Sequence, residues 1–143
     1  YLEALLADVP LAVRESVHFV GVVPHDQLPS WYNRAQVAVF PSRAEAFGLT
    51  CIEAMSCGRA VIMTSRASGP ELVEDGVSGV LVDPSDTEAL ATAICTLLQD
   101  ADLRQRLGAA ARQRAVDQFD LNRIVQQNMA FYRQVLEATR QHE

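Results

Sequence analysis

Short apolar runs alternate with amphipathic segments along most of the chain. The runs SVHFVG (16–21), QVAVF (36–40), AVIMT (60–64) and GVLVD (79–83) are rich in β-branched residues, and turn residues follow them. This pattern predicts four strands. The runs at 36–40 and 60–64 are continuously apolar, so we expect those strands to be covered on both faces.

Helical patterns fill the intervals between these runs. They predict a short helix after Pro24 and helices from Gly48 to Cys57, from Pro70, after a cap at Asp86, over 101–117 and, at the end of the chain, over 121–141. Residues 1–8 are interpreted as the end of another helix. Trp31 and Tyr32 on the first of these helices are interpreted as packing residues.

Strands that alternate with helices predict right-handed crossovers, and therefore an α/β fold with a Rossmann-like parallel sheet and helices on both faces. We expect one domain over 1–143. Four strands are fewer than the five or six of a typical doubly wound sheet, so we expect the domain to be partial.

Composition and charge narrow the classes of function. The chain has 143 residues, a net charge of −6 and twelve positive residues that are all arginine, so broad binding to a nucleic-acid backbone is not expected. Cys51, Cys57 and Cys95 lack the spacing of a zinc or redox motif. We expect no metal or cofactor, reduced thiols and a cytoplasmic protein, since there is neither a secretion signal nor a membrane-spanning run.

The loop PSRAEAFG after the 36–40 strand leads into the helix that starts near Gly48. In parallel sheets, ligands bind beyond the carboxyl ends of the strands. The backbone amides of Gly48, Leu49 and Thr50 therefore predict a site for a small anion such as diphosphate, and Gly48 would allow close approach of a ligand.

Two glutamates flank this stretch. Glu53 lies in an otherwise apolar part of the helix, where a carboxylate needs partners. The hydroxyls of a ribose would serve, and the alternative is a structural acid paired with a buried arginine or a backbone amide. Glu45 precedes the helix and either holds sugar hydroxyls or is a solvated loop acid that favours the helix dipole.

The stretch PSRAEAFGLTCIEAMSCGRAVI resembles the signature of two glutamates separated by seven residues in retaining glycosyltransferases of family 4, and the likeness extends over residues 15–118. That family has the GT-B fold of two facing Rossmann-like domains. The resemblance implies that this chain is the carboxyl-terminal, donor-binding domain, truncated at its amino terminus. It also implies that the terminal helix returns towards the first domain.

The resemblance also implies a role for each position. Glu53 would hold the ribose of a nucleotide-sugar donor. Glu45, the candidate catalytic residue, would hold hydroxyls of the transferred sugar together with the backbone of Phe47 and Gly48. Leu49 and Thr50 would lie against the diphosphate, and the turn near Val22 and Val23 by the nucleobase. Ala46, and a single glycine at Gly69, depart from the family pattern around the sugar.

The family's arginine and lysine pair that grips the diphosphate, and its acceptor-binding domain, would precede residue 1. The chain has no lysine, so we expect it to be inactive alone. Arg104, Arg106, Arg112 and Arg114 form a basic stripe, for which a solvated face is the default and contact of the full-length enzyme with a membrane surface is the alternative. The rival functions are an epimerase or phosphorylase of the same fold and a non-catalytic interaction module.

Overall fold

A computed structural model describes residues 2–140 of the protein. Its centre is a parallel sheet of three strands in the order β1-β2-β3: β1 (Val37–Phe40), β2 (Ala60–Thr64) and β3 (Val80–Val82). Val37 pairs with Ala60, and Ile62 with Val80. The predicted α/β class is confirmed, and three of the four predicted strands are present.

The fourth predicted strand, 16–21, is wrong. Residues 17–24 form no regular element, and Val17, Phe19 and Val20 are exposed. A strand exists only where its backbone groups bond to a neighbour, and within residues 2–140 no strand pairs with this segment. Its apolar pattern alone is therefore insufficient to form a strand.

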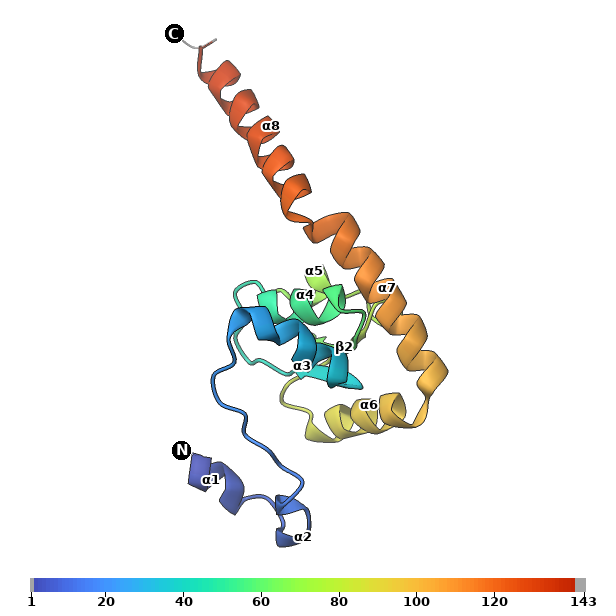
Figure 1. The fold of residues 1–143 in the computed structure, drawn as a ribbon. Coiled ribbons are helices and arrows are strands. Elements are labelled where there is room, and N and C mark those ends of the chain that lie inside the picture. The colour runs from blue at the N-terminus through green and yellow to red at the C-terminus, as the bar shows by residue number, and fades with distance from the viewer. Residues whose placement is uncertain (1, 141–143) are drawn as a thin grey trace.

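Helices cover both faces of the sheet. Figure 1 shows α4 (Leu49–Ser56) and the short α5 (Gly69–Leu72) on one side, and α6 (Thr87–Gln99) on the other. The long helix α7 (Ala101–Phe119) runs along the body and contributes to the core on both sides. On β2, the side chains of Val61 and Met63 pack with α4, whereas those of Ala60 and Ile62 pack with α6. This alternation confirms that β2 is buried on both faces.

Side-chain caps fix the starts of the three longest helices. Asp86 accepts a hydrogen bond from the Ala89 amide at 2.9 Å at the start of α6, as predicted, and Asp100 accepts one from the Leu103 amide at 2.8 Å at the start of α7. The Asp120 carboxylate accepts hydrogen bonds from two amides in the first turn of α8 (Leu121–Arg140). Each carboxylate satisfies amides that have no partner within the helix.

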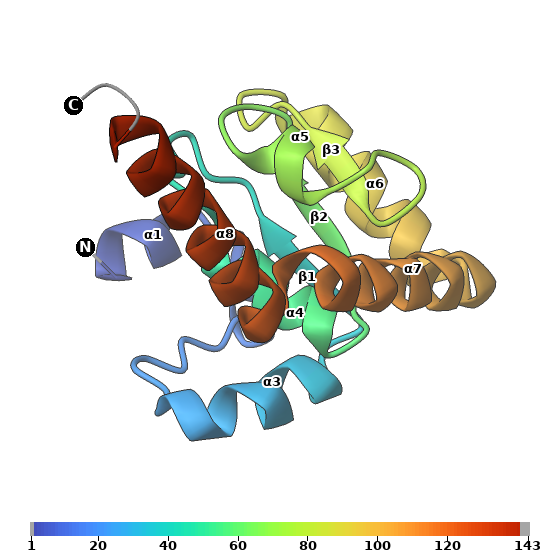
Figure 2. The same cartoon turned by 90° about the horizontal axis from the view of Figure 1, so that it is seen from above.

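The two ends of the described chain extend from this body (Figures 1 and 2). The first segment holds α1 (Leu2–Ala7) and α2 (Leu11–Arg14), and a 3-10 turn, η1 (His25–Gln27), then leads into α3 (Leu28–Arg34). At the other end α8 fills the predicted terminal helix as far as Arg140, and residues 1 and 141–143 lie outside the described residues. Among the described helices, none is long and apolar enough to cross a membrane.

Candidate functional site

The carboxyl ends of the three strands lie at one edge of the sheet, and the loops 41–48, 65–68 and 83–86 follow them. The first of these loops turns into α4 at Gly48, which has φ of 88°. A Cβ atom there would lie 2.6 Å from Cδ1 of Leu72 and 3.1 Å from Cε of Met63. Glycine is thus required by backbone conformation and by packing inside the protein, whereas the sequence interpretation assigned it to close approach of a ligand.

The amino terminus of α4 differs from those of α6, α7 and α8 because no side chain caps it. The amides of Cys51 and Ile52 donate to the Gly48 carbonyl at 3.0 and 3.2 Å. Within residues 2–140, no backbone acceptor lies within hydrogen-bond distance of the amides of Gly48, Leu49 and Thr50. Of the three amides that the sequence singled out, those of the exposed residues Leu49 and Thr50 are therefore available to an anion, with the helix dipole behind them, whereas Gly48 is buried.

Glu53 lies in the second turn of α4, and its side chain is 30% exposed. The hydroxyl of Tyr32 donates a hydrogen bond of 3.1 Å to Oε2 of Glu53, and Nδ1 of His25 lies 3.9 Å from Oε1. Burial, followed by the hydrogen bond to Glu53, raises the pKa of Tyr32 to about 12. The partner of Glu53 is thus a tyrosine, rather than the arginine or backbone amide that the structural alternative proposed.

Tyr32 also packs against the core, as predicted, but its hydroxyl was not expected to meet a carboxylate. The two residues are 21 positions apart, on α3 and α4, so no local spacing marks the pair. Together they line a cavity of about 240 Å³ with His25 and apolar side chains, namely Leu28, Pro29, Leu49 and Ile52.

Glu45 lies on the loop before α4 and is half-buried. Within residues 2–140 its carboxylate has no hydrogen bond or ion pair. Cγ of Glu45 would lie 3.7 Å from a Cβ atom built on Gly48, at the start of α4. Burial, and secondarily the charge of Glu45, raises the pKa of the Cys51 thiol in the same turn to about 12. Glu45 therefore lies by the free amides, while Glu53 lies further along the helix.

Phe47 uses its side chain in packing. Its ring contacts the ring of Phe119 edge-on, with centroids 6.4 Å apart. The residue is 44% exposed, and the sequence interpretation assigned only its backbone to a ligand. Val22 and Val23, expected near a nucleobase, lie in the extended segment before η1, where the Val22 side chain is almost fully exposed.

Gly69 brings the second loop against its own strand. A Cβ atom on this residue would lie 1.7 Å from the carbonyl oxygen of Thr64 at the end of β2. The loop and the start of α5 can adopt this path only with glycine at that position. The one glycine present, where a glycine pair is common in the family, is thus required by contact within the chain.

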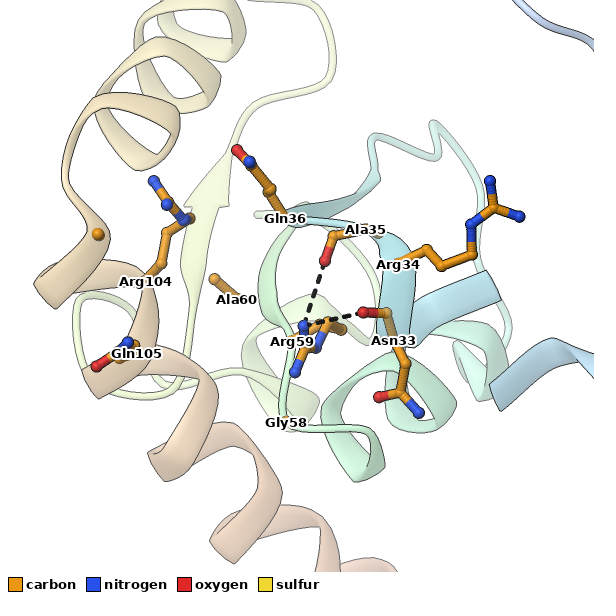
Figure 3. Close-up of a pocket in the computed structure, with 10 residues that line it drawn as sticks. Asn33, Arg34, Ala35, Gln36, Gly58, Arg59, Ala60, Arg104 and Gln105 are labelled. Atoms are coloured by element: carbon orange, nitrogen blue, oxygen red, sulfur yellow. Dashed lines mark hydrogen bonds between the residues drawn. The ribbon is translucent and has the colours of Figure 1, made fainter. Parts of the chain in front are cut away.

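A second cavity, of about 290 Å³, lies at the opposite, amino edge of the sheet (Figure 3). Its polar lining includes Arg59 and Arg104. Arg59 donates to the carbonyls of Asn33, Ala35 and Cys57, and Arg104 to those of Leu97 and Leu98 at 2.6 and 2.7 Å. These arginines therefore hold the carboxyl ends of helices, where cations are favoured.

Two further arginines of the basic stripe on α7 also bind the carboxyl ends of other helices. Arg112 donates to the Ser56 carbonyl at the end of α4, and Arg114 donates to the carbonyls of Leu72 and Glu71 in α5. The default interpretation of a solvated face is wrong for Arg104 and Arg114, which are half-buried, but fits Arg112, which is exposed; all three bind the end of another helix.

Known proteins share both the fold and the sequence. A sucrose-phosphate synthase from Thermosynechococcus elongatus superposes with a TM-score of 0.87 and 36% identity, over 96% of this chain and 34% of that one. HepE from Anabaena, in a structure that contains UDP, superposes with a TM-score of 0.85 and 28% identity, over 93% of this chain and 36% of that one. A second structure of HepE contains UDP-glucose.

These neighbours define the class: the chain has the α/β architecture of GT-B glycosyltransferases. Residues 10–114 match the family model described as glycosyl transferases group 1, so the chain belongs to that family. A D-inositol 3-phosphate glycosyltransferase from Catenulispora acidiphila is 37% identical over 130 residues, which are 91% of this chain and 31% of that protein. The chain thus spans about a third of the length of this relative.

Proposed function

We propose that this chain is the nucleotide-sugar donor-binding domain of a retaining glycosyltransferase of family 4, in the carboxyl-terminal half of its GT-B fold. The full-length enzyme would transfer a sugar from a nucleoside-diphosphate sugar to a hydroxyl of an acceptor. The observation that carries the proposal is that α4 combines two features: its amino terminus has no side-chain cap, and its Glu53 carboxylate is held through only one oxygen. The UDP and UDP-glucose in the HepE structures support it.

In this proposal the donor lies across the amino-terminal half of α4. The diphosphate accepts hydrogen bonds from the amides of Leu49 and Thr50, where the helix dipole favours negative charge. The ribose lies against Glu53. The transferred sugar lies by Glu45 and the backbone of Phe47 and Gly48. The Glu45 carboxylate can accept hydrogen bonds from the sugar without breaking others, because it has no partner within residues 2–140.

The chemistry we propose is electrostatic. Departure of the sugar builds negative charge on the leaving diphosphate, and amide donors already aimed at that place stabilise the charge without reorganising. Retention at the anomeric carbon follows from the family resemblance. No metal takes part in this scheme. The arginine and lysine pair of the family would come from another part of the full-length protein, because this sequence contains no lysine. We therefore expect the chain alone to bind donor without transferring sugar.

A titration of the chain with UDP, GDP and ADP, followed by NMR or calorimetry, tests the binding role. The matched variants are Glu53→Gln, which keeps the shape of the side chain, and Glu88→Gln on the exposed start of α6. We expect at least one nucleotide to bind, Glu53→Gln to weaken it about 10-fold or more, and Glu88→Gln to leave it unchanged. Equal binding by Glu53→Gln and the wild type would remove Glu53 from the ribose role.

The reaction class is tested on the full-length enzyme, with a donor and a sugar acceptor. A new glycoside with the donor's anomeric configuration is the expected product. Epimerised donor without a glycoside would favour the epimerase alternative, and a sugar phosphate would favour the phosphorylase. Failure of all three nucleotides to bind the isolated chain would favour a non-catalytic module.

We also propose a cytoplasmic location. The three cysteines of the chain are free thiols in the structure, as expected in a reducing compartment. Peripheral association of the full-length enzyme with a membrane is the alternative role for the basic stripe, in which Arg104, Arg112 and Arg114 also bind helix ends.

A further inference from the structure

The two carboxylate oxygens of Glu53 have different environments. Oε2 accepts the hydrogen bond from the Tyr32 hydroxyl at 3.1 Å. Oε1 has no hydrogen-bond donor within residues 2–140, since the nearest cationic atom, Nδ1 of His25, lies 3.9 Å away. The carboxylate is thus anchored on one side and open on the other.

Tyr32 is well suited to be a permanent anchor. Burial and the neighbouring carboxylate raise its pKa to about 12, so the hydroxyl stays protonated and remains a donor across the whole working range of pH. The ring packs against the core cluster that also contains Ala54 and Met55 of α4. The hydroxyl is therefore held by a rigid support, whereas Glu53 has three rotatable bonds of its own.

The open oxygen belongs to a residue that lines a mainly apolar cavity. Leu28, Pro29, Leu49 and Ile52 surround much of its volume of about 240 Å³. A ligand that fills this cavity displaces water from Glu53 and must replace the lost hydrogen bonds, because an unpaired carboxylate oxygen in such surroundings is costly. Ligand hydroxyls next to Oε1 are consequently required for tight binding.

We propose that Tyr32 is a positioning residue that orients Glu53 to accept hydrogen bonds from both hydroxyls of a ribose, and thereby makes the site selective for ribonucleoside diphosphate sugars over 2′-deoxyribonucleoside diphosphate sugars. The inference rests on the proposed donor-binding function and adds to it the residue that positions the carboxylate of Glu53. A carboxylate has about four lone-pair positions, and Tyr32 occupies one, so two adjacent hydroxyls can still bind in a bidentate manner. A 2′-deoxy donor offers one hydroxyl fewer and leaves one acceptor unpaired.

The size of the selectivity follows from the charge on the acceptor. A hydrogen bond to an ionised group is worth more than one between neutral groups, and losing it corresponds to about a 10- to 100-fold change in affinity. Without the hydrogen bond from Tyr32, the carboxylate of Glu53 would adopt several orientations, and water would bind both of its oxygens. The affinity gained from a second ribose hydroxyl would then fall. The ratio of ribonucleotide to deoxyribonucleotide affinity therefore reports on the Tyr32 contact itself.

The experiment measures that ratio. The chain is titrated with whichever of UDP, GDP and ADP binds best and with its 2′-deoxy counterpart, for the wild type, Tyr32→Phe, Glu53→Gln and Tyr132→Phe. The phenylalanine at 32 keeps the packed ring and removes only the hydroxyl. Tyr132 is the matched control because it is an exposed tyrosine of α8, 58% exposed.

We expect a ratio of about 10 or more for the wild type and for Tyr132→Phe, and a ratio below about 3 for Tyr32→Phe and Glu53→Gln. Thermal denaturation of each variant gives its stability separately, and a merely structural role for Tyr32 would change stability while the ratio stayed at the wild-type value. An unchanged ratio in Tyr32→Phe, with Glu53→Gln still weakening the ribonucleotide, would overturn the inference alone. Absence of nucleotide binding by the wild type would overturn the proposed function and the inference with it.

Discussion

The helix ends at the amino edge of the sheet differ from the start of α4 at the carboxyl edge. At the amino edge, Arg59 and Arg104 donate to carbonyls at the ends of α3 and α6, and Arg112 donates to the end of α4. At the carboxyl edge, α4 begins at Gly48 without a side-chain cap, and no backbone acceptor within residues 2–140 meets its first amides.

This difference separates polar groups that stabilise the fold from polar groups that are free to bind a ligand. Arginines in a cavity look like an anion site, yet those at the amino edge already have partners within the fold. At the start of α4, by contrast, the first amides and the Glu45 carboxylate have no partner within residues 2–140, although aspartates cap α6, α7 and α8 in the same chain. The ligand site that we propose lies at the groups that the fold leaves without partners, rather than at the most highly charged groups.

The largest expected effect tests whether the carboxyl edge, whose α4 amides have no partner, is nevertheless tightly packed. Gly69→Ala places a Cβ atom 1.7 Å from the Thr64 carbonyl oxygen, so the loop after β2 must move. We expect a loss of about 3 kcal/mol or more in the free energy of unfolding, measured by urea denaturation.

Gly76→Ala is the matched control for that variant. Gly76 has a positive φ, of 71°, which Gly69 does not have, and a Cβ atom at Gly76 would have nothing within 4 Å. It should cost only the strain of the left-handed conformation, about 1 kcal/mol. Equal losses in the two variants would show that crowding at Gly69 is relieved easily and that this edge is loosely packed.

The sequence predicted the sheet better than the contacts between helices. The predicted strands at 36–40, 60–64 and 79–83 correspond to β1, β2 and β3, because each is an apolar run beside another strand of the body. Asp86 caps α6 as predicted, because capping depends only on residues three positions apart. Residues 16–21 have a similar apolar pattern but no strand beside them in the described structure. A pattern of burial predicts a strand only when its partner is also present.

The candidate site shows the same limit. The uncapped start of α4 could be predicted because Gly48 and its neighbours are contiguous in the sequence. The contact between Tyr32 and Glu53 could not, since it depends on how α3 packs beside α4. The arginines of α7 were interpreted as solvated for the same reason: their carbonyl partners lie on α4, α5 and α6.

A second prediction sharpens the comparison from the amino edge. Arg59→Gln removes hydrogen bonds from a guanidinium to three backbone carbonyls, and we expect a loss of about 1–2 kcal/mol in unfolding free energy with nucleotide affinity unchanged. Arg106→Gln is the control, because Arg106 is exposed and makes no side-chain hydrogen bond within the described residues. Nucleotide affinity that falls in Arg59→Gln at unchanged stability would instead make the amino-edge cavity a ligand site.

The smallest expected effect concerns the third loop of the carboxyl edge and its dependence on pH. The Asp83 carboxylate accepts hydrogen bonds from the hydroxyl and the amide of Ser85 and from Arg66, and these contacts lower its pKa from 3.8 to about 2. Between these two values the unfolded chain binds the proton more readily than the folded one. The stabilisation is therefore complete above pH 3.8 and is lost as the pH falls through about 2.

Urea denaturation of the wild type and Asp83→Asn from pH 6 to pH 2 measures this contribution. We expect the wild type to be the more stable by a constant amount above about pH 5, and the difference to shrink as the pH falls from 4 to 2. Asp102→Asn, at an exposed carboxylate in the first turn of α7 that makes no side-chain hydrogen bond within residues 2–140, is the control and should show no such change. A difference for Asp83→Asn that persists undiminished at pH 2 would contradict this expectation. It would mean that the hydroxyl and amide of Ser85 hold the loop equally well when Asp83 is neutral, so that the charge of Asp83 does not stabilise this part of the carboxyl edge.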